Sequence, residues 1–175
     1  LHDSIYEEVI AALKAVAEQV PMGNGLDEEN VLGPLQNRQQ FDIVSRLVED
    51  AKANGGRVVL GGAPATELGE LFYPVTIVAD VADGVALVDE EQFGPALPVI
   101  RYSDVEDAIA SANGLDAGLG ASVWASDRAD ARRIALLTDG EARARRSADA
   151  GRIRYKAGLD DLQSALGAEA SWRAV

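Results

Sequence analysis

Apolar residues recur at helical spacing in two early stretches of the chain. The first set is Ile5, Val9, Ile10, Leu13, Val16 and Val20. This pattern repeats about every 3.6 residues and predicts an amphipathic helix over roughly residues 4–19. A second set with the same spacing is Phe41, Val44, Leu47, Val48 and Ala51, and it stops before Asn54, Gly55 and Gly56. We therefore predict a second helix that ends at these glycines.

Short runs of β-branched and aromatic residues alternate with the helical stretches. They occupy residues 57–60, 72–78, 97–102 and 118–125, and each predicts a strand. Two more helices are expected, one over about residues 103–113 and one that Ser126 caps and that runs through Leu137. Strands that alternate with helices predict an α/β fold with a mainly parallel sheet flanked by helices.

The acidic excess of the chain restricts its partners. The sequence carries 29 acidic and 16 basic side chains, a net charge of -13. Such a charge repels phosphate backbones and anionic lipids, so we expect neither nucleic-acid nor membrane partners. No apolar run approaches the roughly 20 residues that a bilayer span requires. The first residues do not resemble a secretion signal, and we therefore expect a cytoplasmic location.

The character of the sequence changes near Gly140. Residues 1–127 have a net charge of -16, whereas residues 128–175 have a net charge of +3. Residues 141–156 are rich in arginine and follow neither a strand nor a helix period. These residues, with Tyr155 among them, could bind a nucleic acid or an acidic partner. A poorly packed, solvated tail is the favoured interpretation. We therefore expect one domain over residues 1–138 and a divergent arginine-rich tail over 139–175.

The absence of cysteine limits the chemistry of the chain more than any other count. With no Cys, the chain has no disulfide, no thiolate nucleophile and no sulfur-ligated metal. His2 is the only histidine, so no histidine pair can bind a metal, and we predict no metal site. A hydrolase triad of His2, Asp3 and Ser4 is conceivable, but sequence neighbours at a helix start rarely converge.

Two further site types receive little support from the residues. The carboxylates of Asp89, Glu90 and Glu91 could serve a glycosidase, although acids are too common for this to be informative. The glycine pairs at 55–56 and 61–62 lack the third glycine of a dinucleotide-binding fingerprint, and turn glycines are the favoured interpretation.

Residues 90–95 carry a more specific signal. They read Glu-Glu-Gln-Phe-Gly-Pro and resemble the E-E-x-F-G-P motif of the aldehyde dehydrogenase superfamily. Shorter segments also resemble that family and occur in the same order along the chain. Residues 1–6 resemble its VHxSIYD segment, and the others are Gly33-Pro34-Leu35, Gly61-Gly62, Tyr73-Pro74 with Thr76, and Asn113 followed by residues 118–123. Together they cover about residues 1–138, which resemble part of the family's catalytic domain.

The resemblance implies a cofactor and two cofactor-binding residues. In the family, the second glutamate of the motif, here Glu91, accepts hydrogen bonds from the nicotinamide ribose hydroxyls. The phenylalanine, here Phe93, lies against the nicotinamide. A carboxylate can accept two hydroxyl donors at once, and an aromatic face offers a flat apolar wall. The implied cofactor is NAD or NADP. Core packing of Phe93 remains an equal alternative, and the two roles are compatible.

The family reaction needs residues that this chain does not contain. The resemblance implies oxidation of an aldehyde to its carboxylic acid by a cysteine thiolate, with hydride transfer to the nicotinamide. With no Cys, we expect no catalytic residue in this chain and no turnover by it alone. We expect it to bind cofactor weakly at most, because the family's dinucleotide-binding region is also missing.

The ends of the chain suggest a truncated segment. Relatives continue beyond the position of Gly140 into a strand and then a P-F-G-G-type loop. In this chain residues 140–146 stand where that strand should be, and arginines such as Arg143 and Arg145 occupy alternate positions that should be apolar. An altered reading frame or gene near Gly140 is our hypothesis. The alternative function is a non-enzymatic interaction module that pairs with a full-length relative or with itself as a homo-oligomer, because missing sheet neighbours would expose strand edges and apolar patches.

Overall fold

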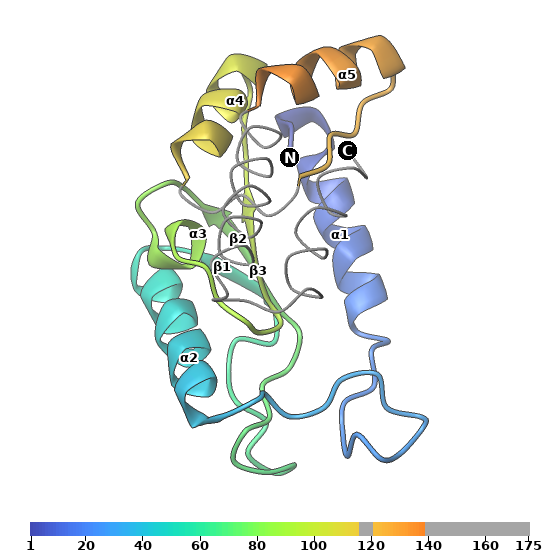
Figure 1. The fold of residues 1–175 in the computed structure, drawn as a ribbon, viewed down its shortest axis with the longest axis vertical. Helices are drawn as coiled ribbons and strands as arrows, with labels where there is room; N and C mark the ends of the chain where they lie inside the picture. The colour runs from blue at the N-terminus through green and yellow to red at the C-terminus, as the bar shows by residue number, and fades with distance from the viewer. Residues whose placement is uncertain (116–120, 139–175) are drawn as a thin grey trace, which may run out of the picture. The chain divides into compact units, whose positions relative to one another are not determined.

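The computed structural model describes residues 1–115 and 121–138. The chain divides into two compact units, Leu1–Asp104 and Val105–Val175. Figure 1 colours the described residues by their number along the chain. The arginine-rich tail and the proposed change near Gly140 lie outside the described residues.

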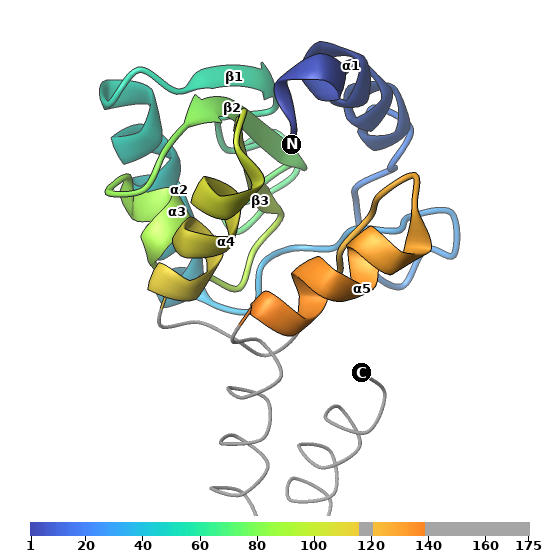
Figure 2. The same cartoon turned by 90° about the horizontal axis from the view of Figure 1, so that it is seen from above.

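The first unit is a small sheet between helices. Its elements are a 3-10 helix Asp3–Ile5, α1 Tyr6–Ala17, α2 Arg38–Ala53, β1 Arg57–Leu60, β2 Thr76–Val81, α3 Ala86–Asp89 and β3 Ala96–Ile100. The strand order is β1-β2-β3, and α1 and α2 lie on opposite sides of the sheet (Figures 1 and 2). The predicted α/β fold with a helix-flanked sheet is confirmed. Of the two strand pairs, β2–β3 is parallel and β1–β2 is antiparallel.

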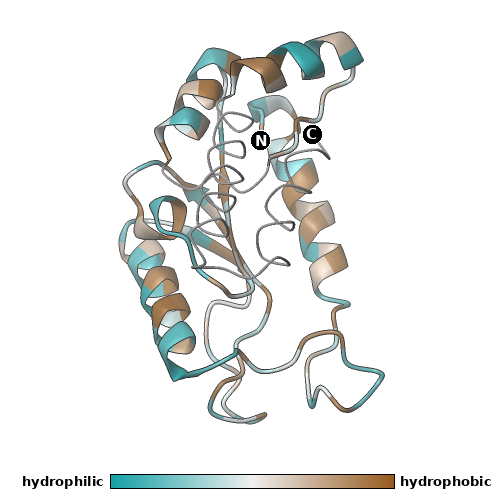
Figure 3. Ribbon diagram, viewed as in Figure 1, coloured by the Kyte–Doolittle hydropathy of each residue, from teal (hydrophilic) through white to brown (hydrophobic). Residues whose placement is uncertain are grey.

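The alternation of side-chain direction along β2 explains why a helix packs on each face of the sheet. Val78 packs with the apolar face of α2, whereas its neighbours Ile77 and Ala79 pack with Tyr6 and Ile10 of α1. Successive side chains of a strand point to opposite faces, so one short strand can supply both cores. Figure 3 shows apolar and polar stretches alternating along both helices.

Helix α2 has clear start and stop signals. The side chain of Asn37 accepts a hydrogen bond from the backbone N–H of Gln40 at 2.9 Å, which caps the helix start. At the other end, Gly55 has a φ of 89°, and the N–H of Gly56 donates to the carbonyl of Ala51 at 2.8 Å. A glycine adopts this left-handed conformation without a side-chain clash. The predicted end before Gly55 is therefore confirmed.

The hydroxyl of Tyr6 connects the two parallel strands. It accepts a hydrogen bond from the backbone N–H of Asp80 at 2.8 Å and donates to the carbonyl of Val99 at 3.0 Å. The β2–β3 register shifts between Ala79 and Val81, and Asp80 between them has a φ of 59°. The hydroxyl thus satisfies backbone groups at an irregularity of the ladder. Burial raises the pKa of Tyr6, so the hydroxyl keeps the proton that it donates.

Charged groups surround the same tyrosine. The guanidinium of Arg101 lies 3.9 Å from the centre of the Tyr6 ring, in cation–π geometry. Arg101 also contacts Glu7 at 3.0 Å, and Arg57 contacts Glu7 at 2.9 Å and Asp80 at 2.6 Å. The hydrogen bond from Arg57 is the main reason that the pKa of Asp80 is lowered. These pairs connect α1 to β1 and to the carboxyl ends of the parallel strands.

Several predicted boundaries were wrong. Strand β2 covers Thr76–Val81 and not residues 72–78. Tyr73 is nevertheless fully buried, so its aromatic character reflects core packing from a loop and not a place in the strand. Strand β3 ends at Ile100, although Tyr102 still forms an isolated bridge with His2. Helix α1 ends at Ala17, two residues earlier than predicted.

The described part of the second unit contains two helices. They are α4 Val105–Gly114 and α5 Arg128–Leu137. Residues 121–125 form no strand, which contradicts the described part of the strand predicted over 118–125. Asp127, and not Ser126, caps α5 by accepting hydrogen bonds from the N–H groups of Ala129 and Asp130 at 2.8 and 3.0 Å. A carboxylate accepts two backbone donors at once, which explains why Asp127 takes this position.

In the part of the chain that the structure describes, no helix combines the length and the apolar character that a membrane crossing requires.

Removal of the Tyr6 hydroxyl tests its role in joining the strands. We expect Tyr6→Phe to remove the hydroxyl partner of a buried carbonyl and of a part-buried N–H group, and to lower the free energy of unfolding by roughly 1–3 kcal/mol. Urea denaturation measures this change. Tyr102→Phe is the matched control, because no hydrogen bond of its hydroxyl occurs among the described residues. Equal stability of the two variants would contradict the bridging role.

Candidate functional site

The loop of residues 90–95 joins α3 to β3 and contains the recognised motif. Its last residue is tied to the neighbouring strand, because the carbonyl of Pro95 accepts the N–H of Thr76 at 2.8 Å. The remaining contacts of the loop come mainly from α2 and from its own backbone. They determine which of its side chains point outward.

Glu90, the first residue of the loop, is bound by α2. The two guanidinium nitrogens of Arg46 donate to the two carboxylate oxygens of Glu90, at 2.6 and 3.3 Å. This hydrogen-bonded pairing lowers the pKa of Glu90 and raises that of Arg46. Both groups are therefore charged at neutral pH, and the first glutamate of the motif has a structural contact.

Gly94 and Gln92 are also held inward. A Cβ built on Gly94 would lie 2.4 Å from Cγ2 of Val44, so the loop backbone approaches α2 more closely than any side chain would permit. The amide of Gln92 donates to the carbonyl of Ala96 at 2.8 Å. The loop is thus anchored at its first, third and fifth residues.

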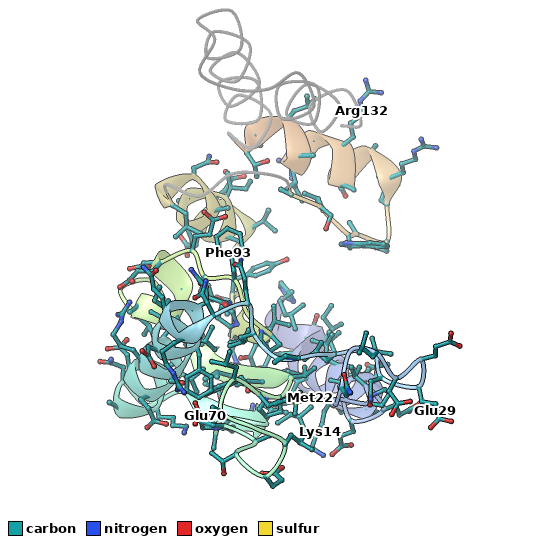
Figure 4. All side chains as sticks on the ribbon, turned by 60° about the horizontal axis from the view of Figure 1, so that its bottom comes forward. Lys14, Met22, Glu29, Glu70, Phe93 and Arg132 are labelled. Carbon is teal, nitrogen blue, oxygen red and sulfur yellow. The ribbon has the colours of Figure 1, made fainter. Side chains whose placement is uncertain are left out.

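Glu91 and Phe93 are the two exposed side chains between these anchors. Phe93 is 69% exposed, and Figure 4 labels it. Glu91 is also exposed, and its carboxylate makes no hydrogen bond or ion pair with any residue that the structure describes. The structure therefore presents together the two residues singled out from the sequence, one as a free acceptor and one as a free aromatic face.

Gln40 is a buried polar group of α2 that the sequence did not reveal. It precedes Val44 by four residues on α2, and so lies on the same face of the helix as the contact to Gly94. The side-chain oxygen of Gln40 is buried and lacks a donor among the described residues. The side-chain oxygen of Gln92 is buried and lacks a donor in the same way. A buried acceptor of this kind has capacity for a ligand hydroxyl or a water. Only the burial of the amide identifies it, and no spacing in the sequence does.

The other candidate chemistries do not assemble. His2 Nδ1 lies 2.8 Å from Ser4 Oγ and also accepts the backbone N–H of Ser4. The carboxylate of Asp3 instead lies 3.6 Å from Arg101, so the three residues do not form a hydrolase triad. No cluster of three or more histidine or acidic side chains in residues 1–115 and 121–138 is placed to hold a metal.

A pocket of about 230 Å³ lies elsewhere in the first unit. The end of α1, the following loop and the ends of β1 and β2 line it, with Met22, Leu32 and Leu60 among its apolar side chains. Its carboxylate, Glu18, is paired with Lys14. Figure 4 labels Met22 and Lys14 well apart from Phe93. The lining therefore offers no nucleophile or free base for catalysis.

Comparisons with curated proteins point to one family. A model of the aldehyde dehydrogenase family matches residues 1–139. The betaine aldehyde dehydrogenase of Cereibacter sphaeroides is 40% identical over 130 residues, which are 74% of this chain and 27% of that protein. The mitochondrial succinate-semialdehyde dehydrogenase of Oryza sativa subsp. japonica is 36% identical over 124 residues, 71% of this chain and 23% of that protein. The chain thus spans about a quarter of the length of these relatives.

Solved structures agree with this result. The NAD+ complex of aldehyde dehydrogenase from Bacillus cereus matches with a TM-score of 0.74 and 34% identity, over 80% of this chain and 28% of that chain. Aldehyde dehydrogenase of Mycobacterium tuberculosis complexed with NAD+ matches with a TM-score of 0.72 and 34% identity, over 77% of this chain and 28% of that chain.

The close contact at Gly94 predicts that the loop tolerates no side chain there. We expect Gly94→Ala to push the loop away from Val44 and to lower stability by about 1–3 kcal/mol, as overpacking does. Thermal unfolding and the amide chemical shifts of residues 90–95 would report both effects. Val44→Ala in the same chain should restore the shifts by making room. Gly33→Ala is the control, since a Cβ at Gly33 meets no atom within 4 Å; an equal effect there would refute the packing argument.

Proposed function

The chain belongs to the aldehyde dehydrogenase family, and we propose that its loop 90–95 contacts the nicotinamide half of NAD or NADP. The proposal rests on a difference between two groups of residues in the motif. Glu90, Gln92 and Gly94 are occupied by contacts inside the protein, whereas Glu91 and Phe93, two positions apart, are exposed. Exposed aromatic and acidic residues on an otherwise anchored loop suit ligand binding.

The chemistry of these groups fits a nicotinamide riboside. The carboxylate of Glu91 can accept hydrogen bonds from both ribose hydroxyls, and Phe93 can cover one face of the nicotinamide ring. The buried oxygen of Gln40, which lacks a donor among the described residues, is a further acceptor on α2. When bound, the nicotinamide would supply the hydride acceptor of an oxidation. The residues of this chain would orient the ring and would not react.

The whole reaction that we propose is the oxidation of an aldehyde to its carboxylic acid. In the family this step uses a cysteine thiolate, as the sequence resemblance implies. The 175 residues contain no Cys, so by themselves they cannot form a covalent bond from sulfur to the aldehyde carbon. We propose that residues 1–138 are part of a catalytic domain and contribute its nicotinamide contact, and that residues 139–175 form a separate divergent tail. The family match to residues 1–139 supports this boundary.

Association with a full-length relative or with a second copy stays a prediction, as does a cytoplasmic location. The exposed side chains of Val16, Leu26 and Val31 are compatible with association, but nothing in the described residues identifies what would cover them.

Nuclear magnetic resonance can locate the cofactor contact on the isolated chain. We expect nicotinamide mononucleotide to shift the amide signals of residues 91–94 with an apparent Kd in the range of about 1 mM or weaker. Glu91→Gln should weaken binding about fivefold or more, because a neutral amide is a poorer acceptor for two hydroxyls. Phe93→Ala should abolish the ring-current shifts of the nicotinamide protons.

Two controls make this experiment specific. Glu29→Gln is the same chemical change at an exposed acid that Figure 4 labels far from Phe93, and it should leave binding unchanged. Adenosine monophosphate carries ribose but no nicotinamide, so its binding should be insensitive to Phe93→Ala. Shifts that map outside residues 90–95, or no shift at saturating ligand, would contradict the proposed contact.

Because the chain contains no thiol, we expect it to be inactive by itself. The purified chain, supplied with NAD+ and an aldehyde, should form no NADH above the rate of the buffer, because it has no thiol. Absorbance of NADH measures the rate, and a full-length family member is the positive control. Sustained NADH formation that co-purifies with the chain would refute the requirement for a thiol.

A further inference from the structure

We propose that Arg46 of α2 is a positioning residue, which fixes the direction of Glu91 and Phe93 by holding Glu90. This inference rests on the proposed function of the loop. Arg46 lies 44 positions before Glu90 in the chain, so only the tertiary structure brings them together.

The geometry of the pair restricts rotation. Nη2 of Arg46 donates to Oε2 of Glu90 at 2.6 Å, and Nη1 donates to Oε1 at 3.3 Å. Because each carboxylate oxygen has its own nitrogen, the plane of the carboxylate is fixed as well as its position. A single lysine ammonium at the same place could hold the charge but could not fix this plane.

The backbone transmits this constraint to the next residues. Glu90 is extended, with φ of -103° and ψ of 133°, and successive side chains of extended backbone point to opposite sides. With Glu90 turned toward α2, this alternation directs Glu91 away from the helix, and Phe93, which precedes the Gly94 seated against Val44, is 69% exposed. Arg46 and Val44 thus hold the two ends of the segment that carries both exposed side chains.

The pair is placed to orient the loop more than to stabilise the fold. The side chains of Arg46 and Glu90 are 54% and 50% exposed, and exposed ion pairs contribute little to unfolding free energy. The other acid near Arg46 is Asp50, whose carboxylate accepts the backbone N–H of Ala86 at 3.0 Å. Glu90 is therefore the carboxylate that hydrogen-bonds Arg46 among the described residues.

The test measures loop order separately from stability. In the chain without ligand, we expect Arg46→Gln to increase the fast backbone motion of residues 91–93 in nitrogen-15 relaxation, with the unfolding midpoint nearly unchanged. We expect binding of nicotinamide mononucleotide to weaken about threefold to tenfold. Arg46→Lys should be intermediate, and the charge exchange Arg46→Glu with Glu90→Arg should recover part of the lost order.

The matched control is Arg38→Gln. Arg38 lies on the same helix and pairs with Glu70 at 3.0 Å, and Figure 4 labels Glu70 away from Phe93. This variant should leave both the loop motion and ligand binding as in the wild type. Loosening of the loop to the same extent by Arg38→Gln would overturn the proposal, since any lost surface charge would then suffice.

The remaining outcomes separate this inference from the proposed function. If the wild type binds nicotinamide mononucleotide and Arg46→Gln binds it equally with an equally ordered loop, Arg46 has no positioning role and the cofactor contact stands. If Arg46→Gln loosens the loop but the wild type does not bind nicotinamide mononucleotide, the proposed cofactor contact is wrong. Arg46 then orders the loop but does not position residues for that ligand. A loosened loop with weakened binding, partly recovered by the charge exchange, supports both.

Discussion

The packing of α2 against the segment that follows β2 is the interaction on which the candidate site depends. Three residues of the helix contact this segment in reverse order: Asp50 accepts the N–H of Ala86, Arg46 binds Glu90, and Val44 meets Gly94. Through these contacts α2 holds α3 and the loop that follows it, from Ala86 to Gly94, by a hydrogen bond, an ion pair and a close contact. The three contacts differ in kind and lie at three separate points of the segment, so α2 holds the segment at both ends and between them.

The sheet gives α2 its own fixed position. Apolar side chains of β2 alternate between α2 on one face and α1 on the other, and this alternation locks both helices to a sheet of three strands. The hydroxyl of Tyr6 then connects β2 and β3 where their ladder is irregular. Strand β3 begins directly after the motif loop, and the contact with Tyr6 lies near its other end, at Val99.

The proposed function gives the chain one part of a reaction site, the cofactor contact. It has an anchored loop with an acceptor and an aromatic face, and it has no thiol for the covalent chemistry of its family. This division matches the extent of its likeness, which covers most of this chain but about a quarter of each relative. Orientation of a cofactor and attack on a substrate are separate tasks, and our proposal assigns only the first to residues present here.

Much of the architecture could be predicted from periodic burial. The strand at residues 57–60 and the helix ending before Gly55 were correct because glycines mark their ends, and a glycine signal is local. The start of β2 was wrong because the aromatic residues at 72 and 73 belong to a loop, and side-chain type alone does not distinguish a buried loop from a strand. The strand expected over 118–125 failed in its described part, and Asp127 replaced Ser126 as a cap because both are suitable and adjacent.

The sequence by itself indicated the family, excluded thiol chemistry and pointed to Glu91 and Phe93 as cofactor-binding residues, because each inference follows from residue identity and order along the chain. Only the tertiary structure decided why those two side chains are exposed. The partner of Glu90 lies on a helix that comes much earlier in the chain, and the space for Gly94 is limited by a valine of the same helix. Such contacts depend on how helices and strands pack in three dimensions, and no local pattern in the sequence encodes them.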